Sequence, residues 1–169
     1  MHKSGFPFTP NDEANELLAA DGTALLIGLC LEQQVRSEKA MMGPFVLRER
    51  LGHLDAAKIA RTPPAKLDRA FRQKPALHRF PGMMAKRVRA LCALIAHEYG
   101  NDGSRLWGGQ TDAEPLYERF KALPGFGEDK AACAVRIMAK YGKQRLRGWQ
   151  RYASDEDLPW EFLGGKRLS

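Results

Sequence analysis

The chain has 169 residues, a net charge of +7 and a sequence pI of about 9.5. This length suits one domain or two closely packed helical lobes, and the positive charge favours a polyanion or an acidic surface as the partner. Three cysteines lie far apart in apolar segments, which argues against a disulfide scaffold and against a zinc site. No apolar run reaches the roughly 18 residues that cross a bilayer. With no signal-peptide core at the N-terminus, we expect a cytoplasmic protein with reduced thiols.

The first helices end at a pair of glutamines. A short helix is predicted from Asn11 or Asp12 to residue 20, and an apolar helix over 24–31 should lie at the centre of the core. The apolar run ends in Glu32-Gln33-Gln34-Val35, where the polarity changes abruptly. Gln33 and Gln34 are either an ordinary polar helix end or side chains that a rigid element delivers to a ligand or a DNA base.

The middle of the chain predicts further helices. Ser37 should cap the next helix, which Pro44 should kink or interrupt. Two short amphipathic helices follow, and then a long helix over 83–99 with one buried stripe. The beginning of this long helix is basic, with Lys86 and Arg87 near its N-terminus. Such charges oppose the helix dipole unless an anion binds there, and a solvated face is the alternative interpretation.

A turn with two glycines separates the last two long helices, predicted over 114–122 and 128–141. Its sequence is Leu123-Pro124-Gly125-Phe126-Gly127. The glycines permit backbone angles that other residues resist, and unpaired N–H groups at the start of the second helix can bind a phosphate. A plain helix connector is the alternative, but seven basic residues between 128 and 151 favour nucleic acid. No alternating run is long enough for a sheet, so the fold should be all-α.

Other side chains offer weaker signals. The four histidines have no metal-ligand spacing, and each is expected at the surface or at a helix end. Trp107 is expected to pack in the core. Trp149 lies beyond the second long helix, where it could stack on an extruded base.

The turn sequence, with Lys130-Ala131 after it and Gln33-Gln34 at the end of an apolar helix, resembles the helix-hairpin-helix superfamily of base-excision DNA glycosylases. The stretch Phe80-Pro81-Gly82 and the residues after it resemble the segment before the hairpin in that superfamily. The resemblance runs from about residue 21 to about residue 143. It implies one all-α domain over 1–169, with two lobes, a cleft between them and the helix-hairpin-helix motif at about 114–141.

The resemblance also implies roles for particular residues. The hairpin would bind a phosphate of double-stranded DNA, with a monovalent cation (K⁺ or Na⁺) at the backbone carbonyls of Leu123 and Gly125. Gln33 and Gln34 would enter the gap that an extruded base leaves, since the glycosidic bond is out of reach inside a duplex. The implied DNA-binding residues are Gln33, Gln34, Gly125, Phe126, Gly127, Lys130, Lys86 and Arg87, with Trp149 at the base pocket.

The chain departs from the family pattern at its catalytic positions. Where bifunctional members carry a lysine nucleophile, this chain has Asp129, and Lys130 is turned about 100° around the helix. A Schiff-base lyase is therefore not expected. Where the family's catalytic aspartate would fall there is no acid, so Asp155 or Asp157 from a longer loop, or Asp129 itself, would assist the reaction. The four-cysteine iron–sulfur loop of some relatives is also missing.

Three functions follow from these residues. The first is a monomeric, monofunctional glycosylase that hydrolyses the N-glycosidic bond of a damaged or deaminated base without a cofactor or a metal bound by side chains. The second is a helix-hairpin-helix protein that binds DNA without catalysis. The third is an all-α protein-interaction domain in which the turn is structural. For either DNA-binding function we expect a cytoplasmic protein, associated with the nucleoid in a bacterium.

Overall fold

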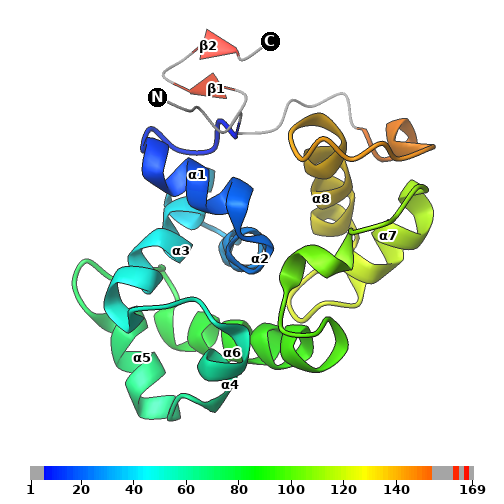
Figure 1. Cartoon of the computed structure of the whole chain (residues 1–169). Coiled ribbons are helices and arrows are strands. Elements are labelled where there is room, and N and C mark those ends of the chain that lie inside the picture. The colour runs from blue at the N-terminus through cyan, green and yellow to red at the C-terminus, as the bar shows by residue number, and fades with distance from the viewer. Residues whose placement is uncertain (1–5, 154–161, 164–165, 168–169) are drawn as a thin grey trace.

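A computed structural model describes residues 6–153 and the backbone of 162–163 and 166–167. Helices dominate this part of the chain (Figure 1), which confirms the predicted all-α class. Two strands of two residues each, β1 (Phe162–Leu163) and β2 (Lys166–Arg167), form an antiparallel pair. The helices are α1 (Asp12–Ala20), α2 (Gly22–Leu31), α3 (Ser37–Leu51), α4 (Ala56–Arg61), α5 (Pro64–Arg72), α6 (Pro81–Glu98), η1 (Gly103–Leu106), α7 (Ala113–Lys121), α8 (Glu128–Lys140) and η2 (Trp149–Tyr152).

Helix α2 is the centre of the core, as its apolar sequence predicts. All ten of its residues are buried, and it packs against α1, α3, α6 and η1. Asp21 ends α1 and caps α2, since its side chain accepts a hydrogen bond from the N–H of Ala24 at 3.1 Å. In the described part of the chain, no single helix is long and apolar enough to cross a membrane, although α1 and α2 meet the criteria together with a bend of 114° between them.

Small residues bring α2 and α3 close together. A Cβ atom on Gly43 would lie 2.4 Å from Cδ1 of Leu31, and one on Gly28 would lie 2.9 Å from the sulfur of Met41. Pro44 lies inside α3 and does not interrupt the helix, so of the expected kink or interruption the interruption is wrong. Pro44 is buried against α2, and tertiary packing holds the helix on both sides of it.

Helix α6 begins at Pro81, two residues before the expected start. Proline is favoured in the first turn of a helix, because its missing N–H would have no partner there. One basic side chain of α6, that of Arg89, has a structural role. Arg89 donates to the carbonyls of Ala60 and Thr62 and so satisfies the C-terminus of α4.

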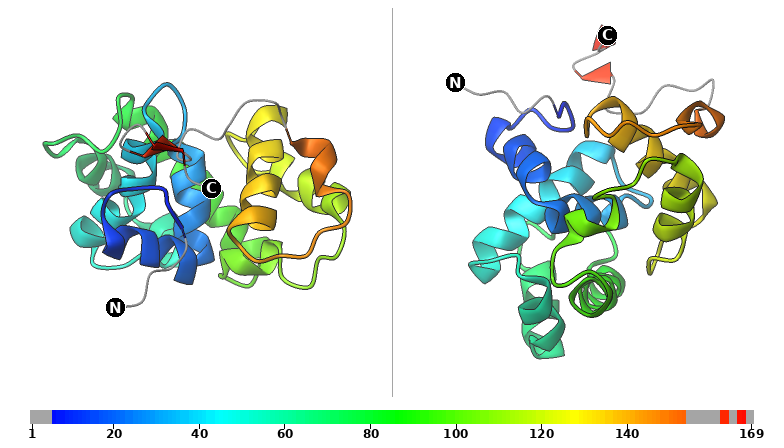
Figure 2. Two further views of the ribbon diagram at one scale, coloured as in Figure 1. Left: turned by 90° about the horizontal axis from the view of Figure 1, so that it is seen from above. Right: turned by 45° about the vertical axis from the view of Figure 1, so that its right-hand side comes forward.

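The last two long helices form a pair at one side of the molecule, and Figures 1 and 2 show them side by side. Helix α8 packs mainly against α7 and η2, and α7 also contacts η1. The chain beyond α8 returns to the start of α7, where the Thr111 carbonyl accepts a bond of 2.8 Å from the N–H of Arg147. The pair's buried side chains belong to the same hydrophobic core as those of α1–α6.

Candidate nucleic-acid interface

The turn between α7 and α8 is tight and partly exposed. Its backbone closes through a 3.1 Å hydrogen bond from the N–H of Phe126 to the carbonyl of Leu123. Gly125 has a φ of +80°, in the left-handed region that favours glycine, and its backbone is exposed. Gly127 is exposed as well and is the N-cap of α8. The Leu123 carbonyl, an expected cation ligand, thus already accepts one hydrogen bond and retains one lone pair.

The side chain of Phe126 anchors the turn to the core. It is buried and stacks on Phe120, with ring centroids 6.4 Å apart, and Phe120 stacks in turn on Trp107 at 6.3 Å. Trp107 is buried, which confirms its expected place in the core. Of the residues assigned to DNA contact, Phe126 therefore has only its backbone to offer a ligand.

The first turn of α8 carries two acids. Glu128 and Asp129 are both exposed, and their negative charges favour the helix because they lie at the positive end of its dipole. The same charges oppose an approaching phosphate. The neighbouring side chain of Lys130 turns toward the protein, so it does not offset them at the exposed surface.

Lys130 links α8 to the end of α2. Its Nζ donates a hydrogen bond of 3.1 Å to the carbonyl of Cys30 and lies 5.4 Å from the ring centroid of Phe126. Burial lowers the pKa of Lys130, while the nearby Cys30 and Glu32 raise it. The ammonium thus caps a carbonyl in the last turn of α2, where a positive charge is favoured.

The two glutamines beyond α2 differ in their environment. Gln33 is half-buried, and its side-chain oxygen accepts a hydrogen bond from the guanidinium of Arg87 on α6. Gln34 is exposed and has a φ of +56°, which is uncommon for a residue other than glycine. The chain turns sharply there, so Gln33 is fixed against α6 whereas Gln34 lies at the surface.

His78 was missed as part of this region, because we expected it at the surface or at a helix end. It is buried, with 1% of its area exposed. Its Nε2 hydrogen-bonds the carbonyl of Leu31 at 2.9 Å, and its Nδ1 accepts the N–H of Phe80 at 2.9 Å. No spacing in the sequence indicates this contact, since Leu31 and His78 lie on segments far apart in the chain. His78 is therefore a structural cap of α2.

Replacing His78 with phenylalanine should lower the free energy of unfolding by about 1–3 kcal/mol at pH 8, because a backbone carbonyl and an N–H lose their partners. Burial lowers the pKa of His78 in the folded protein, so the neutral ring is the stabilising form. The advantage of wild type should be complete above the ordinary histidine pKa of about 6.5 and shrink as the pH falls below it. Urea unfolding of both proteins at pH 8 and pH 5 tests this, and a difference independent of pH would contradict it.

Three segments come together around one pocket of about 500 Å³, called here the turn pocket. The end of α2, the helix α6 and the α7–α8 turn each contribute to its wall. Six of the predicted site residues line it, together with two acids that the prediction left without a role. The lining residues are Glu32, Gln33, Arg87, Gly125, Gly127, Glu128, Asp129 and Lys130.

Other predicted site residues lie elsewhere. Lys86 is exposed and lines a separate hollow with residues of α5. Trp149 is half-buried in η2, which packs on α8 at the end away from the turn (Figure 1). Gln34 is not part of the wall of the turn pocket. Asp155 and Asp157 lie outside the described residues.

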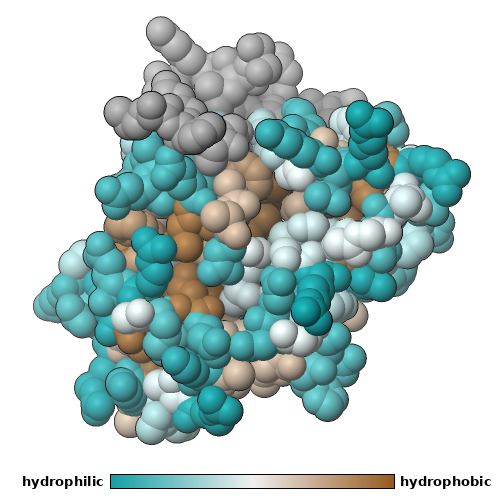
Figure 3. All heavy atoms as spheres, viewed as in Figure 1, coloured by the Kyte–Doolittle hydropathy of each residue, from teal (hydrophilic) through white to brown (hydrophobic). Residues whose placement is uncertain are grey.

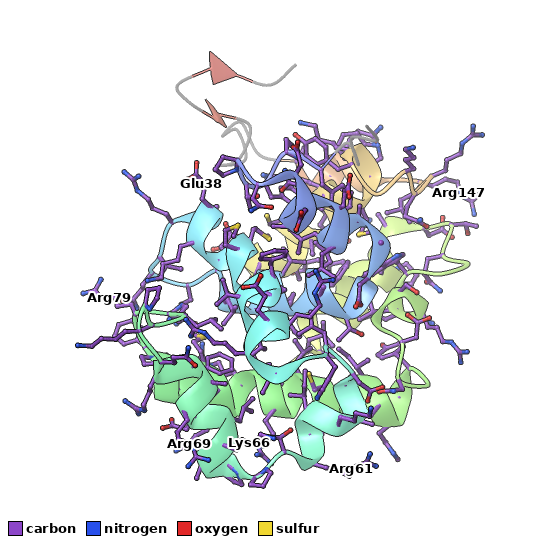
Figure 4. The ribbon with its side chains drawn as sticks, turned by 60° about the vertical axis from the view of Figure 1, so that its left-hand side comes forward. Glu38, Arg61, Lys66, Arg69, Arg79 and Arg147 are labelled. Atoms are coloured by element: carbon purple, nitrogen blue, oxygen red, sulfur yellow. The ribbon has the colours of Figure 1, made fainter. Side chains whose placement is uncertain are left out.

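The positive charge is spread over several faces. In Figure 4, Arg61, Lys66 and Arg69 project from the α4–α5 end, while Arg79 and Arg147 project from two other sides. Figure 3 shows a further face, where an apolar strip over α1 to α3 is bordered by hydrophilic side chains. The distribution of positive charge therefore does not identify the turn pocket as a binding site. The case for this pocket depends on its local geometry.

Comparison with known proteins adds no assignment. No protein-family model matches the chain, and no curated protein matches it either. Among the residues that the structure describes, no three His, Cys, Asp or Glu side chains gather where they could bind a metal ion.

Proposed function

We propose that the chain is a monofunctional DNA glycosylase that hydrolyses the N-glycosidic bond of a damaged or deaminated base in double-stranded DNA. One observation carries the proposal. The glycine turn and the polar end of α2, which are the two segments behind the resemblance, lie far apart in the sequence and line the same pocket.

The turn would bind the DNA backbone. The exposed backbone of Gly125 and Gly127 lets a phosphate approach closely, and the N-terminal N–H groups of α8 can donate to it. Arg87 lines the same pocket and supplies positive charge against Glu128 and Asp129. A monovalent cation, K⁺ or Na⁺, would bind the carbonyls of Leu123 and Gly125.

The end of α2 would act on the base stack. Gln34 is exposed at the sharp bend and would enter the gap that the extruded base leaves. Gln33, held by Arg87, would contact the neighbouring base pair. The buried helix behind them supplies the rigidity that such an insertion needs.

The proposal includes the organisation of the whole chain. Residues 1–169 form one monomeric domain of the glycosylase type, with the helix-hairpin-helix motif at about 114–141 and a cleft between two lobes. Asp129 occupies the position of the lysine nucleophile, so water attacks the sugar directly and no Schiff base forms. Asp129 lines the turn pocket and, with Asp155 or Asp157, would stabilise the positive charge that develops on the sugar.

A base-release assay tests the proposed function. The probes are duplexes that each contain one uracil, hypoxanthine, alkylated adenine or oxidised guanine opposite each normal base. We expect release of at least one of these bases, with a strand break only after treatment with alkali. Strand cleavage without alkali would contradict a monofunctional enzyme, and no release from any duplex would contradict the glycosylase.

A second candidate is a DNA-binding protein without catalysis. It is favoured by Arg147, which lies where the resemblance expects the catalytic acid and instead forms an ion pair with Asp112 at 2.9 Å. This candidate predicts DNA binding that weakens steeply with salt and shows no preference for a lesion. The same set of duplexes in a binding titration at several salt concentrations distinguishes the two.

A further inference from the structure

Of the three acids that line the turn pocket, Glu32 has the most closely fixed position. It is the C-cap of α2, and it follows ten buried helical residues. Its Oε1 accepts a hydrogen bond from the hydroxyl of Ser37 at the start of α3. Backbone and side chain are thus both positioned, which favours a fixed chemical role over that of a mobile surface acid.

The other two acids of the turn pocket have different surroundings. Glu128 and Asp129 are exposed in the first turn of α8, where water screens them. Glu32 is half-buried and lines the same pocket. A carboxylate that is shielded from bulk water interacts more strongly with a nearby charge or proton.

A positive group and a hydroxyl act on Glu32 from two helices. They are the ammonium of Lys130 on α8 and the hydroxyl of Ser37 on α3, while Arg87 on α6 lines the same pocket and hydrogen-bonds Gln33. Burial raises the pKa of Glu32, whereas the Ser37 hydrogen bond and the charge of Lys130 lower it. The balance keeps the pKa above its ordinary value, in the direction that suits a group that exchanges protons near neutral pH.

We propose that Glu32 is the catalytic base that activates water for attack on the sugar, which deepens the proposed glycosylase function and rests on it. The half-buried position in the turn pocket, the anchoring by Ser37 and the nearby ammonium of Lys130 support this role. The resemblance assigns no function to this position. The acids Asp129, Asp155 and Asp157 are left to stabilise the charge that develops on the sugar.

The reaction balances with water as the only co-reactant. The N–C1′ bond breaks and its electron pair leaves with the base. The oxygen of water forms a bond to C1′, and one of its protons passes to Glu32. That proton then passes through solvent to the departing base, so Glu32 returns to its ionised form and the sugar keeps a hydroxyl group.

Single-turnover base release by wild type and Glu32→Gln tests the inference, on whichever duplex of the lesion set wild type cleaves fastest. The amide keeps the shape and can still accept the Ser37 hydrogen bond, so the melting temperature and the affinity for the duplex should stay close to those of wild type. The rate should fall at least about 100-fold, the typical contribution of a positioned acid or base. Glu38→Gln is the matched control, since Glu38 is exposed at the beginning of α3 (Figure 4) and does not line the turn pocket.

The pH dependence gives a second, independent measurement. The wild-type rate should fall as the pH drops through the raised pKa of Glu32, and the residual rate of Glu32→Gln should lack this step. A variant that releases base within twofold of wild type would overturn the role of Glu32 and leave the glycosylase intact. A loss of affinity as large as the loss of rate would also overturn it, because Glu32 would then act in binding. A wild-type protein that releases no base overturns both proposals.

Discussion

Gly125→Ala should weaken binding to duplex DNA by about 10- to 100-fold. Gly125 has a φ of +80°, which costs a residue with a Cβ atom about 1–2 kcal/mol, and the added atom would lie 3.2 Å from Cδ of Arg87. The Arg87 side chain must give by a few tenths of an ångström, and a shift of the turn that relieves the backbone strain would carry the N–H groups of α8 away from the proposed phosphate site. Losing a hydrogen bond to a charged group costs about 1.5–3 kcal/mol, which corresponds to the expected loss of affinity. Fluorescence anisotropy with a labelled duplex at constant salt measures the change.

Gly52→Ala is the control for this experiment. Gly52 has a φ of +83°, and a Cβ atom there would meet nothing within 4 Å. It ends α3, away from the turn pocket, so its variant carries the same backbone strain without touching the proposed interface. An equal loss of affinity in both variants would mean that backbone strain lowers the stability of the folded protein, and that the turn itself has no special role in binding. Unchanged affinity in Gly125→Ala would contradict the proposal that the turn contacts DNA.

Met84→Ala should lower the free energy of unfolding by about 2–5 kcal/mol. The Met84 side chain is fully buried on the core side of α6, and truncating it removes apolar contacts and leaves a cavity. Alanine is the best helix former, so the helix itself should not be weakened. Urea unfolding followed by circular dichroism measures the difference.

Met83 provides the comparison within the same helix. Its side chain is 40% exposed, so Met83→Ala should change the free energy of unfolding by no more than about 0.5 kcal/mol. The two substitutions are chemically identical and one residue apart, and only burial separates them. Equal effects at the two positions would mean that α6 is rotated relative to the arrangement described above.

Much of the fold could be predicted because it depends on local signals. The apolar run of α2, the buried stripe of α6 and the polar caps predicted the helices close to their observed bounds. At Pro44, the local rule that predicts an interruption gave the wrong result. Pro44 lies inside α3 because packing against Gly28 of α2 compensates, and no local pattern encodes that contact.

The site could be predicted only in part. Glycine spacing and the glutamine pair indicated two segments, but nothing in either segment indicates that both line one pocket with Arg87. His78 was expected at the surface or at a helix end and Lys130 in contact with DNA, whereas their role as partners of α2 carbonyls depends on tertiary contacts. Such contacts form between segments dozens of residues apart, so periodicity cannot reveal them.

The fixed position of α2 limits how far the walls of the turn pocket can move. Asp21 caps one end of this helix, and His78 and Lys130 bind carbonyls at the other end. The α7–α8 pair is tied to that helix by the Lys130 hydrogen bond, and its buried side chains belong to the same hydrophobic core. A hinge motion that widened the pocket would have to break this hydrogen bond and open part of the core. In the proposed enzyme, the strength of this link would set how far the pocket adapts to bases of different size.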